Sequence, residues 1–249
     1  MILLELVPKN QDDLVSEAEY ALSKFPINGI NVPDILRFSL RSTDAIKPLL
    51  INNQLAVPHI RSIDRSIEDT LILIKGLIEL GLKKVLIVTG DPPEENRNAC
   101  FDVSPIDIIK NCKQHFPSLE VFAAVDPYRN NFETEIAYAK KKLNVGAAGL
   151  FSQPFFDIDL AKTYLDTFKD THFFLGISPV VTENSKRYWE TRNNVQFPET
   201  FQLDLEYNCK LTKELINLSK SYKQHNYLMP IRVPLADYLK GVFERNTNA

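Results

Sequence analysis

The segment SIEDTLILIKGLIELGLKKVLIVT, residues 66–89, contains the pattern that decides the fold, a helix followed at once by a strand. Ser66 is a good helix start because its hydroxyl can accept a hydrogen bond from a free amide, and acids follow it at the positive end of the helix dipole. Apolar residues then recur at helical spacing until Gly81, a typical helix end. The apolar run over residues 84–89 predicts a strand buried on both faces, as in a parallel sheet.

The same alternation of helix and strand runs along the whole chain. Strands are expected at residues 2–7, 29–32, 54–58, 84–89, 119–125, 148–153, 172–177 and 227–233. Helices are expected at residues 11–24, 42–50, 66–80, 104–114, 132–143, 158–168, 182–191, 205–222 and 235–243. Eight strands, each followed by a helix, predict an α/β fold of the (β/α)8 TIM barrel type, which 249 residues can complete. We therefore predict a single barrel domain over residues 1–249, with a mobile loop near residues 193–202.

The composition argues against several classes of protein. A net charge of -3 gives no general basic field for nucleic acid, and no apolar run is long enough to cross a membrane. The three cysteines, Cys100, Cys112 and Cys209, form no CxxC pair, so we expect no disulfide and no metal site, and a cytoplasmic location. The first residues do not have the pattern of a signal peptide. The motifs GxGxxG, GxxxxGKS/T, HExxH and GxSxG are absent from the sequence.

A glutamate interrupts the otherwise apolar first strand. Desolvation at a barrel mouth would raise the pKa of Glu5, as a general acid that works near neutral pH requires. The alternative is an edge carboxylate that lies in a salt bridge or in solvent. The position of Glu5 alone leaves both readings open.

Polar residues also follow the fourth and sixth expected strands. In Thr89-Gly90-Asp91-Pro92-Pro93, glycine permits close backbone approach, aspartate offers an acceptor and the prolines stiffen the loop, although the motif could also be a capped turn. Gln153 offers the donor and acceptor that a pterin or pyrimidine edge needs. Phe155 and Phe156 fit either the core or a stacking platform.

Two further features could contact a ligand. His59 ends the third expected strand, where a neutral imidazole could hydrogen-bond to a ligand. Lys140, Lys141 and Lys142 form a basic run late in a helix, which is either a solvated face or a site for a diphosphate or a polyglutamate tail.

Five pieces of the sequence, taken in order, resemble one family. They are ELVP at residues 5–8, VPH at 57–59, GD at 90–91, the stretch from Lys142 to QPFFD at 153–157, and GISPV at 176–180. In this order they resemble the methylenetetrahydrofolate reductase family. Its members are (β/α)8 flavoproteins that reduce 5,10-methylenetetrahydrofolate to 5-methyltetrahydrofolate. The resemblance covers almost the whole chain.

The resemblance implies a role for each matching residue. Glu5 would be the general acid that protonates N10 of the folate and opens its five-membered ring to an iminium ion. Asp91 would bind the pterin and favour that cation, Gln153 would bind the pterin edge, and Phe155 is a further candidate for substrate contact. The residues implied to contact FAD are His59, Thr89, Gly90, Ala123, Lys141 and Lys142. NADH or NADPH would be the hydride donor.

The chain departs from the family mainly where flavin would bind. Thr89 stands where the family usually has arginine, and Val125-Asp126-Pro127-Tyr128-Arg129 replaces the usual pattern of aromatic residue, proline and glutamate. One alternative is therefore a flavin-independent folate enzyme that transfers a one-carbon unit or accepts hydride directly from NAD(P)H, with Asp126, Tyr128 and Arg129 in a remodelled pocket. Another is a non-catalytic folate-binding paralogue. The expected partner is a folate, without nucleic acid or membrane, and a homo-oligomer is compatible with the sequence.

Overall fold

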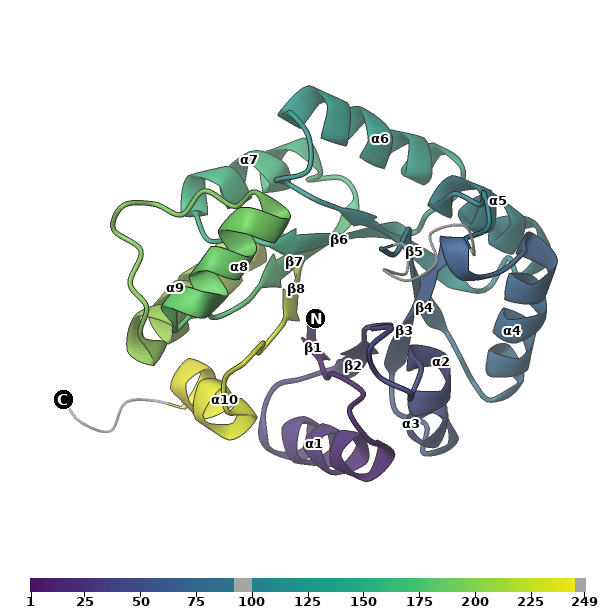
Figure 1. Ribbon diagram of the computed structural model, residues 1–249, viewed down its shortest axis with the longest axis horizontal. Helices are drawn as coiled ribbons and strands as arrows, with labels where there is room; N and C mark the ends of the chain where they lie inside the picture. Colours follow the sequence, from purple (N-terminus) through teal and green to yellow (C-terminus); the bar gives the residue numbers. More distant parts are fainter. Residues whose placement is uncertain (92–99, 245–249) are drawn as a thin grey trace.

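Eight parallel strands close into a barrel in the computed structural model, which describes residues 1–91 and 100–244. Each strand pairs with the next along the chain, and β8 pairs with β1 to complete the ring (Figure 1). The strands are β1 (Ile2–Glu5), β2 (Gly29–Val32), β3 (Ala56–Arg61), β4 (Lys84–Val88), β5 (Glu120–Val125), β6 (Gly149–Pro154), β7 (His172–Ile177) and β8 (His225–Leu228). The predicted (β/α)8 barrel is confirmed; that residues 1–249 form one domain stays a prediction.

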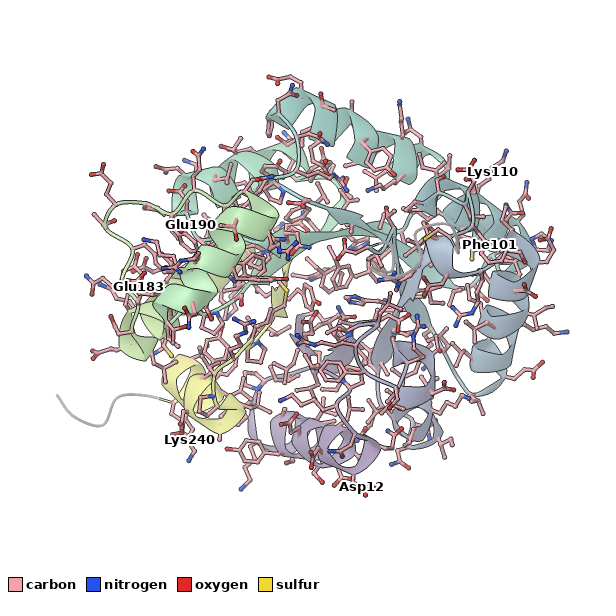
Figure 2. The ribbon with its side chains drawn as sticks, in the orientation of Figure 1. Asp12, Phe101, Lys110, Glu183, Glu190 and Lys240 are labelled. Atoms are coloured by element: carbon pink, nitrogen blue, oxygen red, sulfur yellow. The ribbon has the colours of Figure 1, made fainter. Side chains whose placement is uncertain are left out.

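Helices surround the strands, and two of them lie between β7 and β8 as expected (Figure 1). They are α1 (Gln11–Lys24), α2 (Ser42–Ala45), α3 (Lys47–Ile51), α4 (Ile67–Glu79), α5 (Pro105–His115), α6 (Phe132–Asn144), α7 (Ile158–Thr167), α8 (Glu183–Asn193), α9 (Leu205–Ser221) and α10 (Leu235–Phe243), with the 3-10 turn η1 (Ser62–Asp64). Figure 2 shows Asp12, Lys110 and Lys240 at the periphery of this ring, on α1, α5 and α10. In the described part of the chain, no helix combines the length and the apolar character that a bilayer crossing needs.

Local signals explain where most helices begin. The hydroxyl of Ser66 accepts a hydrogen bond from the amide of Asp69 at 3.0 Å, as the sequence predicts for the start of α4. The helix expected over residues 42–50 is instead two short helices, divided at Ile46. The reason is Pro48 in the first turn of α3, because proline has no amide hydrogen to continue the bonding of α2.

The barrel separates two cores, because successive side chains of a strand point to opposite faces. The inner core combines aliphatic and aromatic residues: the ring of Phe151 stacks on Phe174 with centroids 4.1 Å apart, and Phe122 packs edge-on against both. The outer face of the strands packs against the helices in a larger apolar core. These inner residues fill the middle of the barrel, so a ligand can enter only at an end of the strands.

Three strands, β1, β3 and β8, differ from the prediction by two or more residues at an end. β3 begins at Ala56 and continues to Arg61, where it pairs with β4. β1 ends at Glu5 rather than at residue 7, and β8 covers His225–Leu228 rather than residues 227–233. The chain after β8 contains Pro230 and Pro234, which cannot donate hydrogen bonds to a neighbouring strand.

Candidate active site

A cavity of about 620 Å³ opens at the carboxyl ends of the strands. This is the end of the barrel at which enzymes of this architecture carry their chemistry. The predicted site residues in its lining are Glu5, His59, Thr89, Gly90, Asp91 and Gln153. They come from β1, β3, β6 and the turn after β4, so the fold brings together residues that are distant in sequence.

Glu5 lies against a tyrosine that the sequence analysis did not identify. The hydroxyl of Tyr227, on β8, donates a hydrogen bond to Oε2 of Glu5 on the adjacent strand β1. Burial raises the pKa of Glu5 from 4.5 to about 7, while the hydrogen bond from Tyr227 acts in the opposite direction. Burial and the charge of Glu5 raise the pKa of Tyr227 well above 10. Near neutral pH the pair can therefore hold a transferable proton on Glu5 and keep Tyr227 as a neutral donor.

His59 is held as a neutral imidazole beside this pair. Desolvation lowers the pKa of His59 from 6.5 to about 4, although the carboxylate of Asp34 opposes the shift. The side-chain amide of Asn31, on β2, lies 3.0 Å from Nε2 of His59 and shares a hydrogen bond with it. The hydroxyl of Tyr227 lies 3.5 Å from the same nitrogen. His59 thus contacts Asn31 and Tyr227 at the base of the cavity and carries no charge near neutral pH.

Arg61 holds the turn that contains Gly90 and Asp91. Its guanidinium donates to the backbone carbonyl of Asp91 and to Oδ1 of Asp64, the latter at 3.0 Å. Gly90 has φ +84, and a Cβ added there would lie 2.7 Å from Cζ of Arg61. A glycine at this position therefore lets the backbone pass close to the arginine. Arg41 completes the ion cluster by bridging Asp64 and Asp34, with 2.5 Å to each carboxylate.

A β-bulge directs Gln153 into the cavity. The register between β6 and β7 shifts between Phe151 and Pro154, and both Ser152 and Gln153 line the cavity as a result. The hydroxyl of Ser152 accepts from the amide of Gly176 at 2.8 Å, which ties the bulge to β7. Within residues 1–91 and 100–244, the carboxamide of Gln153 has no hydrogen-bond partner, so it is available to a ligand.

Four of the predicted site residues do not line the cavity: Ala123, Phe155, Lys141 and Lys142. Ala123 and Phe155 are fully buried in the outer core between strands and helices. The alternation of side chains along β5 places Ala124, not Ala123, at the cavity. Lys141 is exposed on α6. Pro92 and Pro93, quoted above with the Gly-Asp turn, lie outside the described residues.

Lys142 is occupied by the protein itself. Its ammonium group donates to the backbone carbonyl of Ala124 at 2.6 Å and lies 4.0 Å from the ring centroid of Tyr138. Desolvation, and then the charge of Arg129, lower the pKa of Lys142 from 10.5 to about 8. The lysine is 3% exposed, so it is not placed to neutralise the phosphate of a ligand in the cavity.

Residues 125–129, which differ from the usual pattern of the family, form part of one wall of the cavity. Asp126 and Arg129 line it, whereas the hydroxyl of Tyr128 donates to the carbonyl of Pro154 at 3.0 Å. Arg129 makes a bidentate pair with the fully buried Glu135, at 2.7 Å and 2.8 Å. Glu135 also accepts from the amide of Asp126 at 2.9 Å, so α6 fixes this wall.

Other lining residues were missed by the sequence analysis. They are Arg37, Arg61, Tyr188, Trp189, Arg192, Tyr227 and Arg232, among others. Tyr227 lies on β8 and Arg61 ends β3, so their signal in the sequence is that both are polar residues at or near expected strands. The residues of α8 have none, because nothing in a surface helix tells which of its turns leans over the barrel mouth.

The sequence relatives of the chain are reductases. A protein from Pectobacterium carotovorum named 5,10-methylenetetrahydrofolate reductase is 24% identical over 171 residues, which are 66% of this chain and 57% of that protein. The protein of the same name from Salmonella typhimurium is 21% identical over 156 residues, 61% of this chain and 53% of that protein. The chain thus spans little more than half the length of these relatives.

Solved structures agree on the fold, and a family model assigns the family. A 2,3-dimethylmalate lyase matches with a TM-score of 0.59 and 10% identity over 94% of this chain and 75% of that chain. A dihydropteroate synthase from Thermus thermophilus matches with a TM-score of 0.51 and 11% identity over 97% of this chain and 90% of that chain. These likenesses show the barrel alone. The family model described as Methylenetetrahydrofolate reductase matches residues 39–218, and the chain therefore belongs to the methylenetetrahydrofolate reductase family.

Proposed function

We propose that the chain reduces 5,10-methylenetetrahydrofolate to 5-methyltetrahydrofolate with NADH or NADPH as the hydride donor. The proposal rests on family membership and on one observation: a carboxyl group whose pKa is raised to about 7 faces a cavity at the catalytic end of a barrel. General acids are efficient when their pKa lies near the working pH. Binding of a folate without reaction does not require such a group.

Glu5 is the proposed acid. The protonated carboxyl gives its proton to N10 of the bound folate, the bond between N10 and the methylene carbon breaks, and an iminium ion forms at N5. Hydride addition to the methylene carbon then yields the N5-methyl group. Tyr227 keeps the carboxyl oriented by donating to Oε2 throughout. After the transfer, the same hydrogen bond stabilises the Glu5 carboxylate.

Asp91 and Gln153 are the proposed substrate ligands. Both line the cavity, and neither side chain has a hydrogen-bond partner among the residues that the structure describes. The carboxylate of Asp91 can accept from the pterin ring and favours the cationic iminium electrostatically. The carboxamide of Gln153 can pair with the donor and acceptor on the pterin edge.

The residues that the resemblance assigns to FAD do not fit that cofactor as the chain arranges them. Ala123 is in the outer core, Lys141 is exposed on α6 and Lys142 is bonded to the carbonyl of Ala124. Only His59, Thr89 and Gly90 of the assigned set line the cavity. This arrangement favours a flavin-independent folate enzyme, in which the nicotinamide gives its hydride directly to the substrate.

One experiment tests the reaction and the cofactor together. The purified protein is incubated with 5,10-methylenetetrahydrofolate and NADH or NADPH, with and without added FAD, and 5-methyltetrahydrofolate is identified by mass. We expect product without added flavin from a protein that has no flavin absorption band. A yellow protein that needs FAD would refute the direct transfer and keep the reductase. No product under any of these conditions would refute the proposed function.

A further inference from the structure

Arg61 is a buried charged residue that the proposed chemistry does not use. It is the last residue of β3, it is 5% exposed, and it lies in the wall of the active-site cavity. Burial of an arginine lowers stability unless other groups compensate its charge and accept its hydrogen bonds. The groups that contact the guanidinium therefore indicate the role of this arginine.

Asp64 compensates the charge of Arg61. Nε of Arg61 donates to both carboxylate oxygens of Asp64, at 3.0 Å and 3.1 Å. Asp64 lies in η1, and its Oδ2 also accepts from Nη2 of Arg41 at 2.5 Å. Arg41 in turn makes a bidentate pair with Asp34, at 2.7 Å and 2.5 Å. Two arginines and two carboxylates thus form a series of ion pairs that is electrically balanced.

Arg61 contacts Asp91 through the main chain and not through the carboxylate. Nη2 of Arg61 donates to the backbone carbonyl of Asp91. Among the described residues, the carboxylate within 4.0 Å of this guanidinium is that of Asp64, and the Asp91 side chain is exposed. Gly90 permits the contact, since a Cβ at this position would lie 2.7 Å from Cζ and 2.8 Å from Nε of Arg61. The turn is therefore held at its backbone, while the Asp91 carboxylate is not paired with the arginine.

This arrangement separates two effects that an arginine beside an aspartate would otherwise combine. An ion pair with Arg61 would fix the Asp91 carboxylate, but it would also compensate the negative charge that favours an iminium ion. The same pair would occupy the oxygens that are proposed to accept from the pterin. Because Asp64 already binds the guanidinium, Arg61 can hold the turn without either effect.

We propose that Arg61 and Asp64 are positioning residues of the active site. Asp64 keeps Arg61 away from the carboxylate of Asp91, so that the arginine fixes the turn by its carbonyl and leaves the charge of Asp91 to the substrate. The inference rests on the proposed function, in which Asp91 binds the pterin and stabilises the iminium ion. Neither positioning residue needs to touch the substrate, because both act through the place and the charge of Asp91.

The test measures kcat and KM for 5,10-methylenetetrahydrofolate in a set of variants. In Asp64→Asn the guanidinium of Arg61 loses its carboxylate, and it already contacts Asp91, whose side chain can replace that partner. We expect kcat to fall about ten- to a hundredfold, the range that corresponds to the loss of one hydrogen bond to a charged group. KM should rise by less, because the iminium charge exists only after the folate ring has opened.

A double variant distinguishes this role from a purely structural one. In Asp64→Asn/Arg61→Gln no cation remains at position 61 to pair with Asp91, so kcat should be higher than in Asp64→Asn alone. Loss of a purely structural ion pair would not be reversed by removal of its second member. Arg61→Gln alone loosens the turn but leaves the charge of Asp91 uncompensated, so it should raise KM more than it lowers kcat.

Two further variants serve as controls. Asp64→Glu keeps the carboxylate and should retain most of the native kcat. Asp44→Asn removes an exposed carboxylate on α2, which pairs with Lys47 at 2.7 Å and does not line the cavity, so kcat should not change. Thermal melts of all variants show which of them are folded.

Several results would overturn the inference. A double variant with kcat equal to or below that of Asp64→Asn would show that the ion pair acts through the fold alone. If Asp64→Asn does not fold, a lower kcat with unchanged KM in Arg61→Gln, or a loss of kcat in a folded Asp64→Glu, would refute it. Absence of turnover by the native chain would refute the proposed function itself, whereas the other results leave that function in place.

Discussion

Replacement of Glu5 by glutamine is the sharpest test of the proposed chemistry. The change keeps the size of the side chain and an oxygen that can accept from Tyr227, and it removes the proton that Glu5 can donate. Loss of a general acid lowers the rate by about a hundred- to ten-thousandfold. Since the pKa of Glu5 is about 7, kcat/KM of the native enzyme should fall as pH rises through this value, and that limb should disappear in the variant.

The same replacement has a predicted effect on stability, with a sign that can be checked. Between pH 4.5 and about 7 the unfolded chain has released the Glu5 proton and the folded chain still holds it. The free energy of unfolding therefore falls as pH rises through this window, by at most about 3 kcal/mol for this group. Glu5→Gln should remove the fall and be the more stable protein above about pH 7.

Two measurements decide the outcome. Denaturant unfolding of both proteins across the pH window gives the stability difference, and initial rates give the pH profile. Glu120→Gln is a control on the opposite end of the barrel, because Glu120 pairs with Lys84 at the start of β5. A Glu5→Gln protein that turns over at the native rate, or one that is less stable than the native chain at high pH, would refute the assignment of a buried protonated acid.

Three further predictions concern neighbouring parts of the site. Tyr227→Phe removes the hydrogen bond that lowers the pKa of Glu5, so the alkaline limb of kcat/KM should move to higher pH; a shift to lower pH would contradict the pairing. Gly90→Ala should lower the free energy of unfolding by about 1–3 kcal/mol and reduce turnover, because its Cβ would meet Arg61 at a positive φ. The control Gly76→Ala has open space around it in α4, so it should raise the free energy of unfolding by about 0.5–1 kcal/mol in the same thermal melts. Glu135→Gln weakens the ion pair between the buried Glu135 and the partly exposed Arg129, and it should lower the free energy of unfolding by about 1–3 kcal/mol. The exposed Glu133→Gln on the same helix should change it by less than about 0.5 kcal/mol. Equal melting temperatures for the two variants would refute the structural importance of this pair.

The sequence predicts the barrel well because its helices and strands are locally encoded. α4 has its capping serine and periodic apolar residues, and β4 is a short apolar run, so neither needs distant contacts to be recognised. Boundaries were less predictable where pairing decides them, as at β3, which is a strand as far as Arg61 because β4 offers it a partner.

The site was predictable only in part because its geometry depends on register. Glu5, Asp91 and Gln153 are polar groups at strand ends, and a cavity at that end brings them together. A shift of one residue decides that Ala124 rather than Ala123 faces the cavity, and the sequence does not show it. Tyr227 is 222 residues from Glu5, so their pairing follows from closure of the barrel and not from any local pattern.

The pairing of β1 with β8 also determines when the site can form during folding. The acid lies on the first of the described strands, and its tyrosine partner lies on the last of them. A nascent chain could form most of its helices and sheet long before the two strands meet, since that contact spans the longest loop in the barrel. The proposed active site would then form in a single late step, when β1 pairs with β8. Recovery of activity during refolding would therefore report on closure of the barrel more directly than a signal from helix formation does.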